Sequence, residues 1–338
     1  MKEAMFYEKL DDEKVKCNLC PWNCEIASGK RGVCGVRENR EGKLYSLSYE
    51  NIASATPDPI EKKPLFHFAP GSRTYSICTP GCNWKCKYCQ NWQLSQGSLG
   101  GRSLTPKEIV SSAKKAGTQG ISYTYTEPTI FFELAYETAK LASQEGLYNT
   151  FVTNGYINPE PIKKIAPYLD AVTVDFKGSG EEKFLKDFAG VPTVDPIYTA
   201  IEEYFDQEIH LEITDLIVPR VGDSEEKIEE LVQWIAEDLG TEVPVHFLRF
   251  YPAHKVKDLP PTDVGKLEKA KKIAEAAGLN HVYLGNVGGE SDTVCPSCGE
   301  GLIYRSGGRI ARINLEDGLC PSCGSKAAIA GTEWMSRS

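Results

Sequence analysis

Three closely spaced cysteines are the part of this sequence best suited to chemistry at a metal. Cys82, Cys86 and Cys89 have the spacing C-x3-C-x2-C, and the aromatic Tyr88 stands just before the last cysteine. Three thiolates on one short loop can hold three irons of a [4Fe–4S] cube, which leaves the fourth iron an open position for chemistry. From spacing alone, the alternative is a structural zinc loop or three reduced, buried thiols.

All twelve cysteines fall into three groups of four. Disulfides are not expected in a chain with cytoplasmic features, whereas clustering at short spacing is what metal ligation requires. The first group is Cys17, Cys20, Cys24 and Cys34; the second is Cys78, Cys82, Cys86 and Cys89; the third is Cys295, Cys298, Cys320 and Cys323. Within the second group, we interpret Cys78 as a buried and inert strand residue.

The first group has the spacing C-x2-C-x3-C-x9-C, which suits a closed zinc site or a second iron–sulfur cluster. We favour zinc, or another closed structural site, because the segment is too small to bury a core and a metal would supply folding energy. A second cluster that relays electrons is the alternative.

The third group consists of two Cys-Pro-Ser-Cys-Gly knuckles, which are typical of a zinc ribbon with a structural or docking role. No histidine lies between the knuckles, so four cysteine ligands are expected. A rubredoxin-like iron is the alternative.

Composition bounds the class of protein. The chain has 338 residues, enough for one large domain with small appendages, and its 41% hydrophobic and 25% charged content is ordinary for a soluble globular protein. A net charge of −9 without a long basic tract argues against nucleic-acid binding. We see no secretory signal and no membrane-spanning run, so a cytoplasmic location without membrane partners is expected.

From residue 74 onward, strand-like and helix-like segments alternate. The expected strands are residues 74–78, 120–125, 147–153, 171–175, 208–218, 245–250 and 281–285. The expected helices are residues 105–117, 128–145, 159–169, 180–188, 195–206, 224–239 and 262–278. About six βα units in series predict an α/β fold with a parallel sheet, either an open doubly wound sheet or a partial barrel. No Gly-x-Gly-x-x-Gly follows a strand, which argues against a Rossmann dinucleotide site.

The chain divides accordingly into three predicted parts. Residues 1–73 form a four-cysteine metal-binding segment and a linker, which covers residues 38–73. Residues 74–290 form the core, and residues 291–338 form the zinc ribbon.

Polar residues stand at the predicted C-terminal ends of the strands, where parallel α/β proteins bind ligands. A carboxylate, amides, hydroxyls and bases on one rim would suit a zwitterionic amino acid joined to an adenine nucleoside. For any single residue, the alternative is a turn residue or a helix cap. The rim residues are Thr126, Glu127, Pro128, Thr153, Asn154, Gly155, Asp175, Lys177, Arg220, Arg249, Tyr251 and His254.

The cysteine motif, with its aromatic residue before the third cysteine, resembles the signature of the radical S-adenosylmethionine (radical SAM) superfamily. The resemblance covers about residues 75 to 290. It implies a partial (β/α)6, TIM-like barrel, here with small cysteine-rich metal-binding segments at both ends. It also implies that Cys82, Cys86 and Cys89 ligate a [4Fe–4S] cluster to which SAM binds.

Two elements of the rim carry the resemblance further. Glu127-Pro128 resembles the end of the Gly-Gly-Glu-Pro element that binds the SAM amino group, with Tyr125 and Thr126 in place of the two glycines. Thr153-Asn154-Gly155 resembles the Thr-Asn-Gly element of glycyl-radical-enzyme activases, where an aspartate stands in place of Val152.

Three further positions are implied in the same way. Asp175-Phe176-Lys177 resembles the Asp-Leu-Lys element of those activases. Arg220 replaces the glycine of their Ile-Pro-Gly-x-x-Asp loop, and His254 falls near a histidine that lies against SAM. The resemblance therefore implies SAM contacts from Tyr88, Glu127, Thr153, Asn154, Asp175, Lys177, Arg220 and His254.

A subgroup is similar over more of the chain. Cys-Asn-Leu-Cys-Pro-Trp-Asn-Cys, Cys-Gly-Val-Arg, Ser-Tyr-Thr-Tyr-Thr-Glu-Pro-Thr, Leu-Arg-Phe-Tyr-Pro and the final Cys-Pro-x-Cys-Gly pair resemble the AmmeMemoRadiSam-system radical SAM enzymes, which are similar to pyruvate formate-lyase activating enzyme. That name implies Memo-like and AMMECR-like proteins as possible partners, and the chemistry implies a reductant such as ferredoxin or flavodoxin.

We therefore predict a radical SAM enzyme that cleaves SAM reductively to a 5′-deoxyadenosyl radical, which abstracts hydrogen from an unidentified substrate. The protein would orient SAM and exclude water, while the cofactor carries the chemistry. A glycyl-radical-enzyme activase is one form of this hypothesis. A non-catalytic metal or Fe–S scaffold is the alternative from another class, and a nucleic-acid-modifying enzyme is a third, weakened by the charge.

Overall fold

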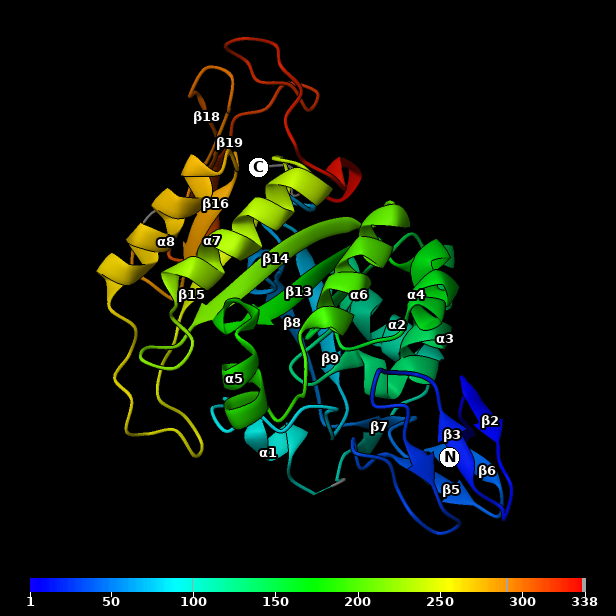
Figure 1. Cartoon of the computed structure of the whole chain (residues 1–338). Coiled ribbons are helices and arrows are strands. Elements are labelled where there is room, and N and C mark those ends of the chain that lie inside the picture. Colours follow the sequence, from blue (N-terminus) through cyan, green and yellow to red (C-terminus); the bar gives the residue numbers. More distant parts are fainter. Residues whose placement is uncertain (99, 290, 336–338) are drawn as a thin grey trace.

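A computed structural model describes residues 1–98, 100–289 and 291–335. Its centre is an eight-stranded sheet with the order β16-β15-β14-β13-β12-β11-β9-β8 (Figure 1). The parallel strands are β9 (Arg73–Cys78), β11 (Gly120–Tyr123), β12 (Tyr148–Thr153), β13 (Ala171–Lys177), β14 (His210–Ile217), β15 (Val245–Arg249) and β16 (Val282–Gly285).

The strand order decides between the two arrangements that the sequence left open. Each parallel strand lies beside its neighbour in the chain from β9 to β16, so the winding never reverses. A doubly wound sheet reverses direction at a switch point, whereas a TIM-like barrel does not. The predicted α/β fold with a partial barrel is therefore confirmed.

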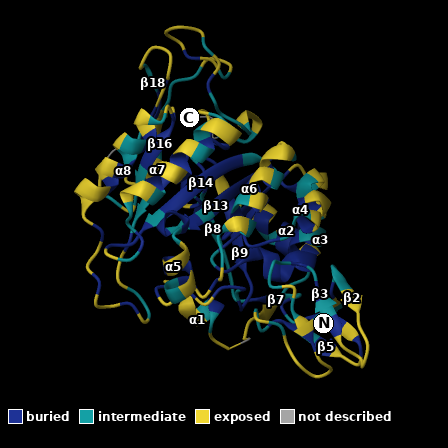
Figure 2. Cartoon of the chain, viewed as in Figure 1, coloured by how far each residue is buried: buried dark blue, intermediate teal, exposed yellow. Residues whose placement is uncertain are grey.

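The helices follow the strands and cover the sheet. They are α2 (Pro106–Lys115), α3 (Phe132–Gln144), α4 (Pro159–Ile165), α6 (Asp195–Asp206), α7 (Glu225–Trp234) and α8 (Val264–Ala276), with the short α1 (Trp92–Ser95) and α5 (Glu182–Phe184). Thr105 and Glu108 form a capping box at the start of α2, and Ser224 accepts from the Lys227 backbone N–H at the start of α7. Figure 2 shows buried strands behind helices that turn exposed residues outward.

The N-terminal residues form two small antiparallel sheets, β1 (Lys2–Glu3)–β6 (Lys43–Ser46)–β5 (Arg37–Arg40) and β2 (Tyr7–Lys9)–β3 (Val15–Cys17)–β4 (Glu25–Ile26). They are fixed to the barrel by a buried ion pair of 2.6 Å between Arg37 and Glu133 of α3. The Met5 backbone N–H also donates to Glu133, at 2.7 Å.

One part of the predicted linker is wrong. Residues Ser54–Pro59 form β8, which pairs antiparallel with β9 along its whole length. Its two prolines had favoured a linker over a strand. Proline is nevertheless tolerated on an edge strand, and β8 is the edge strand of this sheet. The short strand β7 (Asn51–Ile52), which precedes β8, pairs antiparallel with β10 (Arg102–Ser103). The three-part division of the chain remains a prediction.

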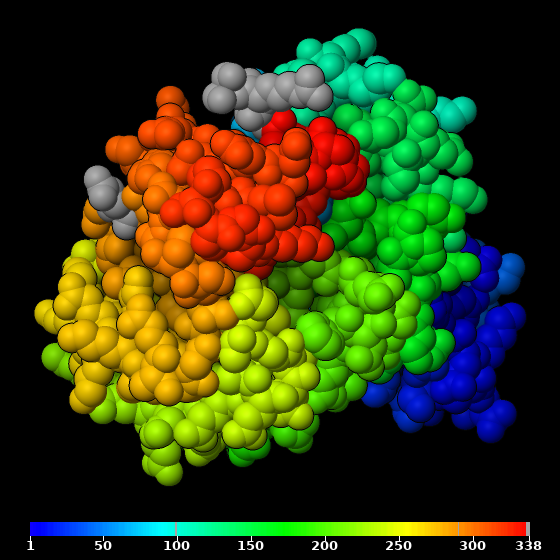
Figure 3. Space-filling view, turned by 90° about the horizontal axis from the view of Figure 1, so that it is seen from above, coloured from blue at the N-terminus to red at the C-terminus, as the bar shows by residue number. Residues whose placement is uncertain are grey.

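The C-terminal residues form a three-stranded antiparallel sheet of β17 (Thr293–Val294), β18 (Gly301–Ser306) and β19 (Arg309–Ile313). They lie at the end of the barrel where the parallel strands begin, because Trp334 contacts the ring of Tyr148, the first residue of β12. Figure 3, which looks onto this end, shows the orange and red C-terminal residues covering it. Among the described residues, no helix is both long and apolar enough to cross a membrane.

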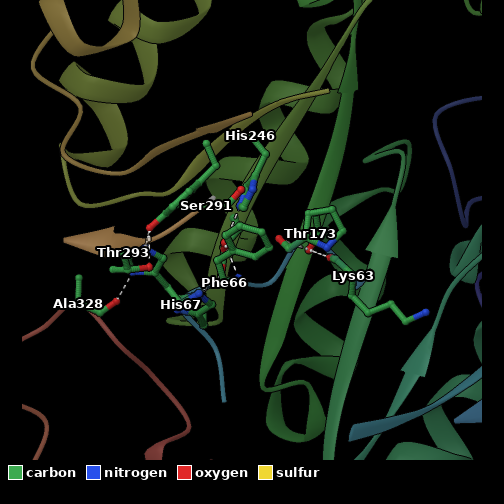
Figure 4. A network of polar contacts seen from close by, with 12 residues as sticks. Lys63, Phe66, His67, Thr173, His246, Ser291, Thr293 and Ala328 are labelled. Carbon is green, nitrogen blue, oxygen red and sulfur yellow. Dashed lines mark hydrogen bonds and ion pairs between the residues drawn. The ribbon is translucent and has the colours of Figure 1, made fainter. Parts of the chain in front are cut away.

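A buried polar network joins this C-terminal sheet to the barrel (Figure 4). His67 contacts the Ala328 carbonyl through Nδ1 at 2.7 Å and the Tyr283 hydroxyl through Nε2 at 2.6 Å. Glu212 of β14 accepts from the His67 backbone N–H at 2.7 Å and binds the His246 ring at 2.7 Å. The segment before β9 is thereby held between the barrel and the C-terminal sheet.

Candidate active site

A cavity of about 290 Å³ opens at the C-terminal ends of the parallel strands. It lies at the opposite end of the barrel from the C-terminal sheet, on the side where α1 follows the cysteine loop (Figure 1). The predicted site and rim residues that line it are Cys82, Cys86, Tyr88, Cys89, Thr126, Glu127, Thr153, Asn154, Asp175, Lys177 and Tyr251. The fold therefore brings the cysteine motif and most of the predicted rim to one place.

The cysteine loop is held by the turn and helix that follow it. The Gly81 backbone N–H donates to the Leu94 carbonyl at 3.0 Å, and the Gln96 amide donates to the Cys86 carbonyl at 3.0 Å. Ser95 lies 3.3 Å from the sulfur of Cys89. These contacts aim the side chains of the loop into the cavity.

The three cysteines fit several irons better than one ion. Among the described residues, only the C-terminal cysteines form a group of potential metal ligands whose atoms all lie within 4.8 Å of one another. Cys82, Cys86 and Cys89 share a cavity without being that close, as expected when each thiolate binds its own iron. Burial raises the pKa of Cys86 to about 12, so a bound metal would be needed to hold its thiolate.

Glu127 is an organising residue whose two carboxylate oxygens both accept hydrogen bonds. One oxygen accepts from the Thr129 hydroxyl and the Thr153 hydroxyl, both at 2.7 Å, and the other accepts from the Asn154 backbone N–H at 2.8 Å. Burial raises its pKa, although these hydrogen bonds oppose that effect. Glu127 thus ties the loop after β11 to the loop after β12.

Asn154 extends this support to the cysteine loop. Its amide donates to the side chain of Asn83 at 2.9 Å, and Asn83 donates to the Tyr156 carbonyl at 2.8 Å. Since Asn83 follows Cys82 directly, the loop after β12 fixes the start of the cysteine motif. Sequence reasoning missed Asn83, which stands between Cys82 and Cys86 inside the motif.

Asp175 and Lys177, at the end of β13, form an ion pair on the cavity wall. The Thr214 hydroxyl orients Asp175 with a hydrogen bond of 2.8 Å. Burial alone would lower the pKa of Lys177, but the carboxylate of Asp175 and the nearby Cys86 raise it. The lysine is therefore a fixed positive charge beside the cysteines, suited to an anionic group.

Tyr125 keeps a conformation that glycine would favour. Its φ is +63°, and it stands where the related Gly-Gly-Glu-Pro element has a glycine. Its carbonyl accepts from Asn91 at 2.9 Å, its hydroxyl donates to Asp58, and Lys63 lies 4.4 Å from its ring centre. These contacts offset the strain of the left-handed backbone.

Lys62 and Lys63 also line the cavity, and sequence reasoning missed both because they come from the predicted linker. The carbonyl of Lys63 accepts from Thr173 of β13 at 2.6 Å, which brings the linker against the barrel (Figure 4). Burial lowers the pKa of Lys63 to about 8, although its ion pair of 2.9 Å with Asp58 opposes that shift.

The remaining wall suits a nucleoside with an amino acid tail. Val152, Leu216, Leu248 and Phe250 give it an apolar side. The buried ring of Tyr88 lies on the same wall, with its hydroxyl beside the thiol of Cys86. Apolar surface with a few polar groups is what small-molecule sites offer.

Two predicted SAM contacts do not lie on the cavity wall. Arg220, with a φ of +71°, is in the exposed turn after β14, and the ring of His254 stacks on Trp92 with centres 4.8 Å apart. Arg249 is also turned away, since its Nε donates to the Thr262 carbonyl at 2.8 Å. Cys78 is buried at the end of β9 and does not line the cavity.

The other two cysteine groups lie elsewhere. Cys17, Cys20, Cys24 and Cys34 surround a small separate cavity in the N-terminal residues. The sulfurs of Cys295, Cys298, Cys320 and Cys323 all lie within 4.8 Å of one another, as four ligands of one metal ion would.

Comparisons with known proteins agree with this geometry. The family model of the radical SAM superfamily matches residues 76–235. The uncharacterized protein MJ0808 of Methanocaldococcus jannaschii is 42% identical over 336 residues, which cover 97% of this chain and 99% of that protein. The putative glycyl-radical enzyme activating enzyme MJ1632 of the same organism is 27% identical over 202 residues, 59% of this chain and 76% of that protein.

Among solved structures, Streptococcus suis SuiB bound to S-adenosylmethionine matches with a TM-score of 0.50 and 16% identity. The match covers 68% of this chain and about half (53%) of that chain, and it shows a shared fold. The family match, the similarity to MJ0808 over almost the whole chain and the cysteine-lined cavity lead to one conclusion. The chain belongs to the radical SAM superfamily of enzymes.

Proposed function

We propose that this enzyme cleaves SAM reductively and uses the product radical to abstract hydrogen from a substrate. The observation that carries the proposal is one cavity that unites Cys82, Cys86 and Cys89 with the polar ends of β11, β12 and β13. In this proposal the three cysteines hold a [4Fe–4S] cluster through three irons. When bound, the cluster and SAM supply the chemistry, a one-electron cleavage to methionine and a 5′-deoxyadenosyl radical.

The protein's own residues bind, orient and shield. Lys177, held by Asp175, gives a positive charge for the SAM carboxylate, and the Tyr88 ring on the cavity wall can contact the nucleoside. Glu127 and Asn154 hold the loops around the cavity through hydrogen bonds to protein partners, and both line the cavity where SAM would bind. The apolar wall formed by Val152, Leu216, Leu248 and Phe250 would exclude water from the radical.

The proposal also covers the form of the activity, the partner proteins and the metal at the C-terminal cysteines. A glycyl-radical-enzyme activase is favoured as the form of the activity by the 27% identity to MJ1632, which is named as a putative activating enzyme. The electron would come from a donor such as ferredoxin or flavodoxin in the cytoplasm. Memo-like and AMMECR-like proteins are proposed partners, and zinc is the proposed ion of the C-terminal cysteines.

The test is anaerobic reconstitution with iron and sulfide, followed by SAM, dithionite and an assay of 5′-deoxyadenosine. The matched variants are Cys86→Ala and Cys78→Ala, since both cysteines are buried and only Cys86 lines the cavity. We expect product from the wild type and from Cys78→Ala, and none above background from Cys86→Ala. Equal amounts of 5′-deoxyadenosine from both variants would show that the cysteine motif takes no part in the reaction. An intact cluster with no product from the wild type, alone or with the Memo-like protein, would favour a scaffold.

A further inference from the structure

The N-terminal cysteines line one small cavity, but they do not form a group of closely spaced ligands. Cys17, Cys20, Cys24 and Cys34 all line one small cavity of about 10 Å³. A zinc ion bound by four thiolates at about 2.3 Å would draw the sulfurs to roughly 3.8 Å from one another in a tetrahedron.

The chain contains its own comparison for this geometry. In the C-terminal group, the sulfurs of Cys295 and Cys323 lie 3.7 Å apart, and those of Cys298 and Cys320 lie 3.6 Å apart. The four sulfurs of that group are all within 4.8 Å, whereas no three of the N-terminal cysteines meet this limit. The sulfurs of the N-terminal group are thus farther apart than those of the C-terminal group, as are those of Cys82, Cys86 and Cys89. This spacing fits thiolates that each bind a different iron of a cube.

The surroundings suit a buried group of negative charge. The cavity is otherwise lined by apolar side chains and by Arg37, which is 2% exposed. The Arg37 guanidinium pairs with Glu133 through one nitrogen, but its Nε has no hydrogen-bond partner among the described residues. A buried arginine with an unused donor beside four thiolates stabilises an anionic metal–thiolate group.

The cavity lies directly against the catalytic loop. A Cβ added at Gly81 would lie 3.2 Å from the Cys34 carbonyl oxygen, and Gly81 immediately precedes Cys82. The indole of Trp22, also on the cavity wall, donates to the Asn83 carbonyl at 2.9 Å. Contacts on both sides of Cys82 therefore connect the two cysteine groups without an intervening element.

We propose that Cys17, Cys20, Cys24 and Cys34 hold a second [4Fe–4S] cluster, which passes single electrons to the cluster at Cys82, Cys86 and Cys89. The inference rests on the proposed function for the receiving cluster. With four protein ligands the second cluster has no open iron, so it transfers electrons without binding SAM. A low-potential one-electron protein donor is oxidised as this cluster is reduced, and the cluster is reoxidised when the electron moves on.

The first test counts metals in the full-length chain after anaerobic reconstitution. In the triple variant Cys82→Ala, Cys86→Ala and Cys89→Ala, we expect about four irons and four sulfides per chain to remain, with one zinc, as a single [4Fe–4S] cluster and the ribbon require. Two zinc ions and no iron would overturn the inference while leaving the proposed function intact.

A second measurement guards against misfolding of that variant. The wild type should hold about eight irons and one zinc per chain, and Cys20→Ser with Cys24→Ser should hold about four irons. About four irons with two zinc ions in the wild type would also overturn the inference. If the Cys20→Ser and Cys24→Ser variant alone lacks iron, the N-terminal site is needed for folding, and the variant should then unfold at a lower temperature than the wild type. In that case the iron and zinc counts of the wild type decide the question.

The third test asks whether the two clusters lie close enough to interact. It records electron paramagnetic resonance spectra of the protein after reduction with dithionite. Two reduced clusters in contact through Gly81 should broaden each other's signals. We expect a wild-type spectrum that differs from the sum of the spectra of the two variants. A wild-type spectrum equal to that sum would refute the electron relay.

Discussion

At the scale of single residues, the cavity wall includes one residue with an unfavourable backbone conformation and one buried charged residue. Tyr125 holds a left-handed backbone, and Lys63 is 1% exposed. Both are stabilised by Asp58, which binds the Tyr125 hydroxyl and pairs with Lys63. Burial alone would raise the pKa of Asp58, but hydrogen bonds from Lys62, Tyr125 and Lys63 hold it well below its ordinary value.

Replacing Asp58 should therefore cost much more than replacing a surface carboxylate. Asp58→Asn leaves the buried Lys63 without its charge partner, and we expect a loss of about 3 kcal/mol in the free energy of unfolding. The control is Asp187→Asn, whose partner Lys183 is 80% exposed, and which should change stability by less than about 1 kcal/mol. Urea unfolding of both variants measures this, and equal losses would contradict it.

At the scale of elements, the cysteine loop is clamped between α1 and the N-terminal sheets. Gly81 has a φ of +105°, and a Cβ there would lie 2.7 Å from Cγ1 of Val36. Only glycine allows both the backbone conformation and the close approach. The position of the catalytic loop is thus set partly by residues far away in sequence.

Gly81→Ala should disturb this contact. We expect a destabilisation of about 2–4 kcal/mol from backbone strain and overpacking together. Gly117→Ala is the matched control, because Gly117 also has a positive φ of +65° but nothing within 4 Å of an added Cβ, and it should cost about 1 kcal/mol. Thermal unfolding of the two variants gives the comparison. Equal melting temperatures would show that the close approach contributes nothing.

At the scale of the whole molecule, the two ends of the barrel have different tasks. The cavity lies at the C-terminal ends of the strands, and the C-terminal sheet covers the other end (Figures 1 and 3). The two are joined through the His67 and Glu212 network. His67 is buried and neutral, since its Nδ1 donates to a carbonyl and burial lowers its pKa well below the ordinary value.

This network should make stability depend on pH. Below about pH 6.5 the unfolded chain protonates His67 while the folded chain does not, so stability falls as pH decreases. From pH 8 to pH 5 this costs up to about 2 kcal/mol. Melting temperatures across that range measure it, and His67→Gln, which cannot take up a proton, should flatten the slope. An unchanged slope in that variant would exclude His67 as the cause.

The separation of the two ends also predicts independence of the proposed zinc site. Cys298→Ser should remove about one zinc per chain and lower the melting temperature, because structural zinc contributes folding energy. Formation of 5′-deoxyadenosine with dithionite should stay within about twofold of the wild type, because the site is at the far end from the cavity. Zinc analysis and the product assay test this together. A large loss of product would show coupling between the ends.

The sequence by itself determined the features that depend on near neighbours. The spacing of Cys82, Cys86 and Cys89, the alternation of strands and helices, and the caps at Thr105 and Ser224 are local patterns. They predicted the α/β fold, the helices and most residues at the strand ends, since parallel strands carry their C-terminal ends to one edge.

Tertiary structure decided what depends on contacts between distant segments. It placed Lys63 of the predicted linker on the cavity wall, left Arg220 and His254 off it, and made β8 an edge strand. It also set the N-terminal cysteines around a cavity, where spacing alone had favoured zinc. Spacing along the chain states how many thiolates can converge, but the distance between their sulfurs is fixed only by the packing around them, and that distance distinguishes one ion from a cluster.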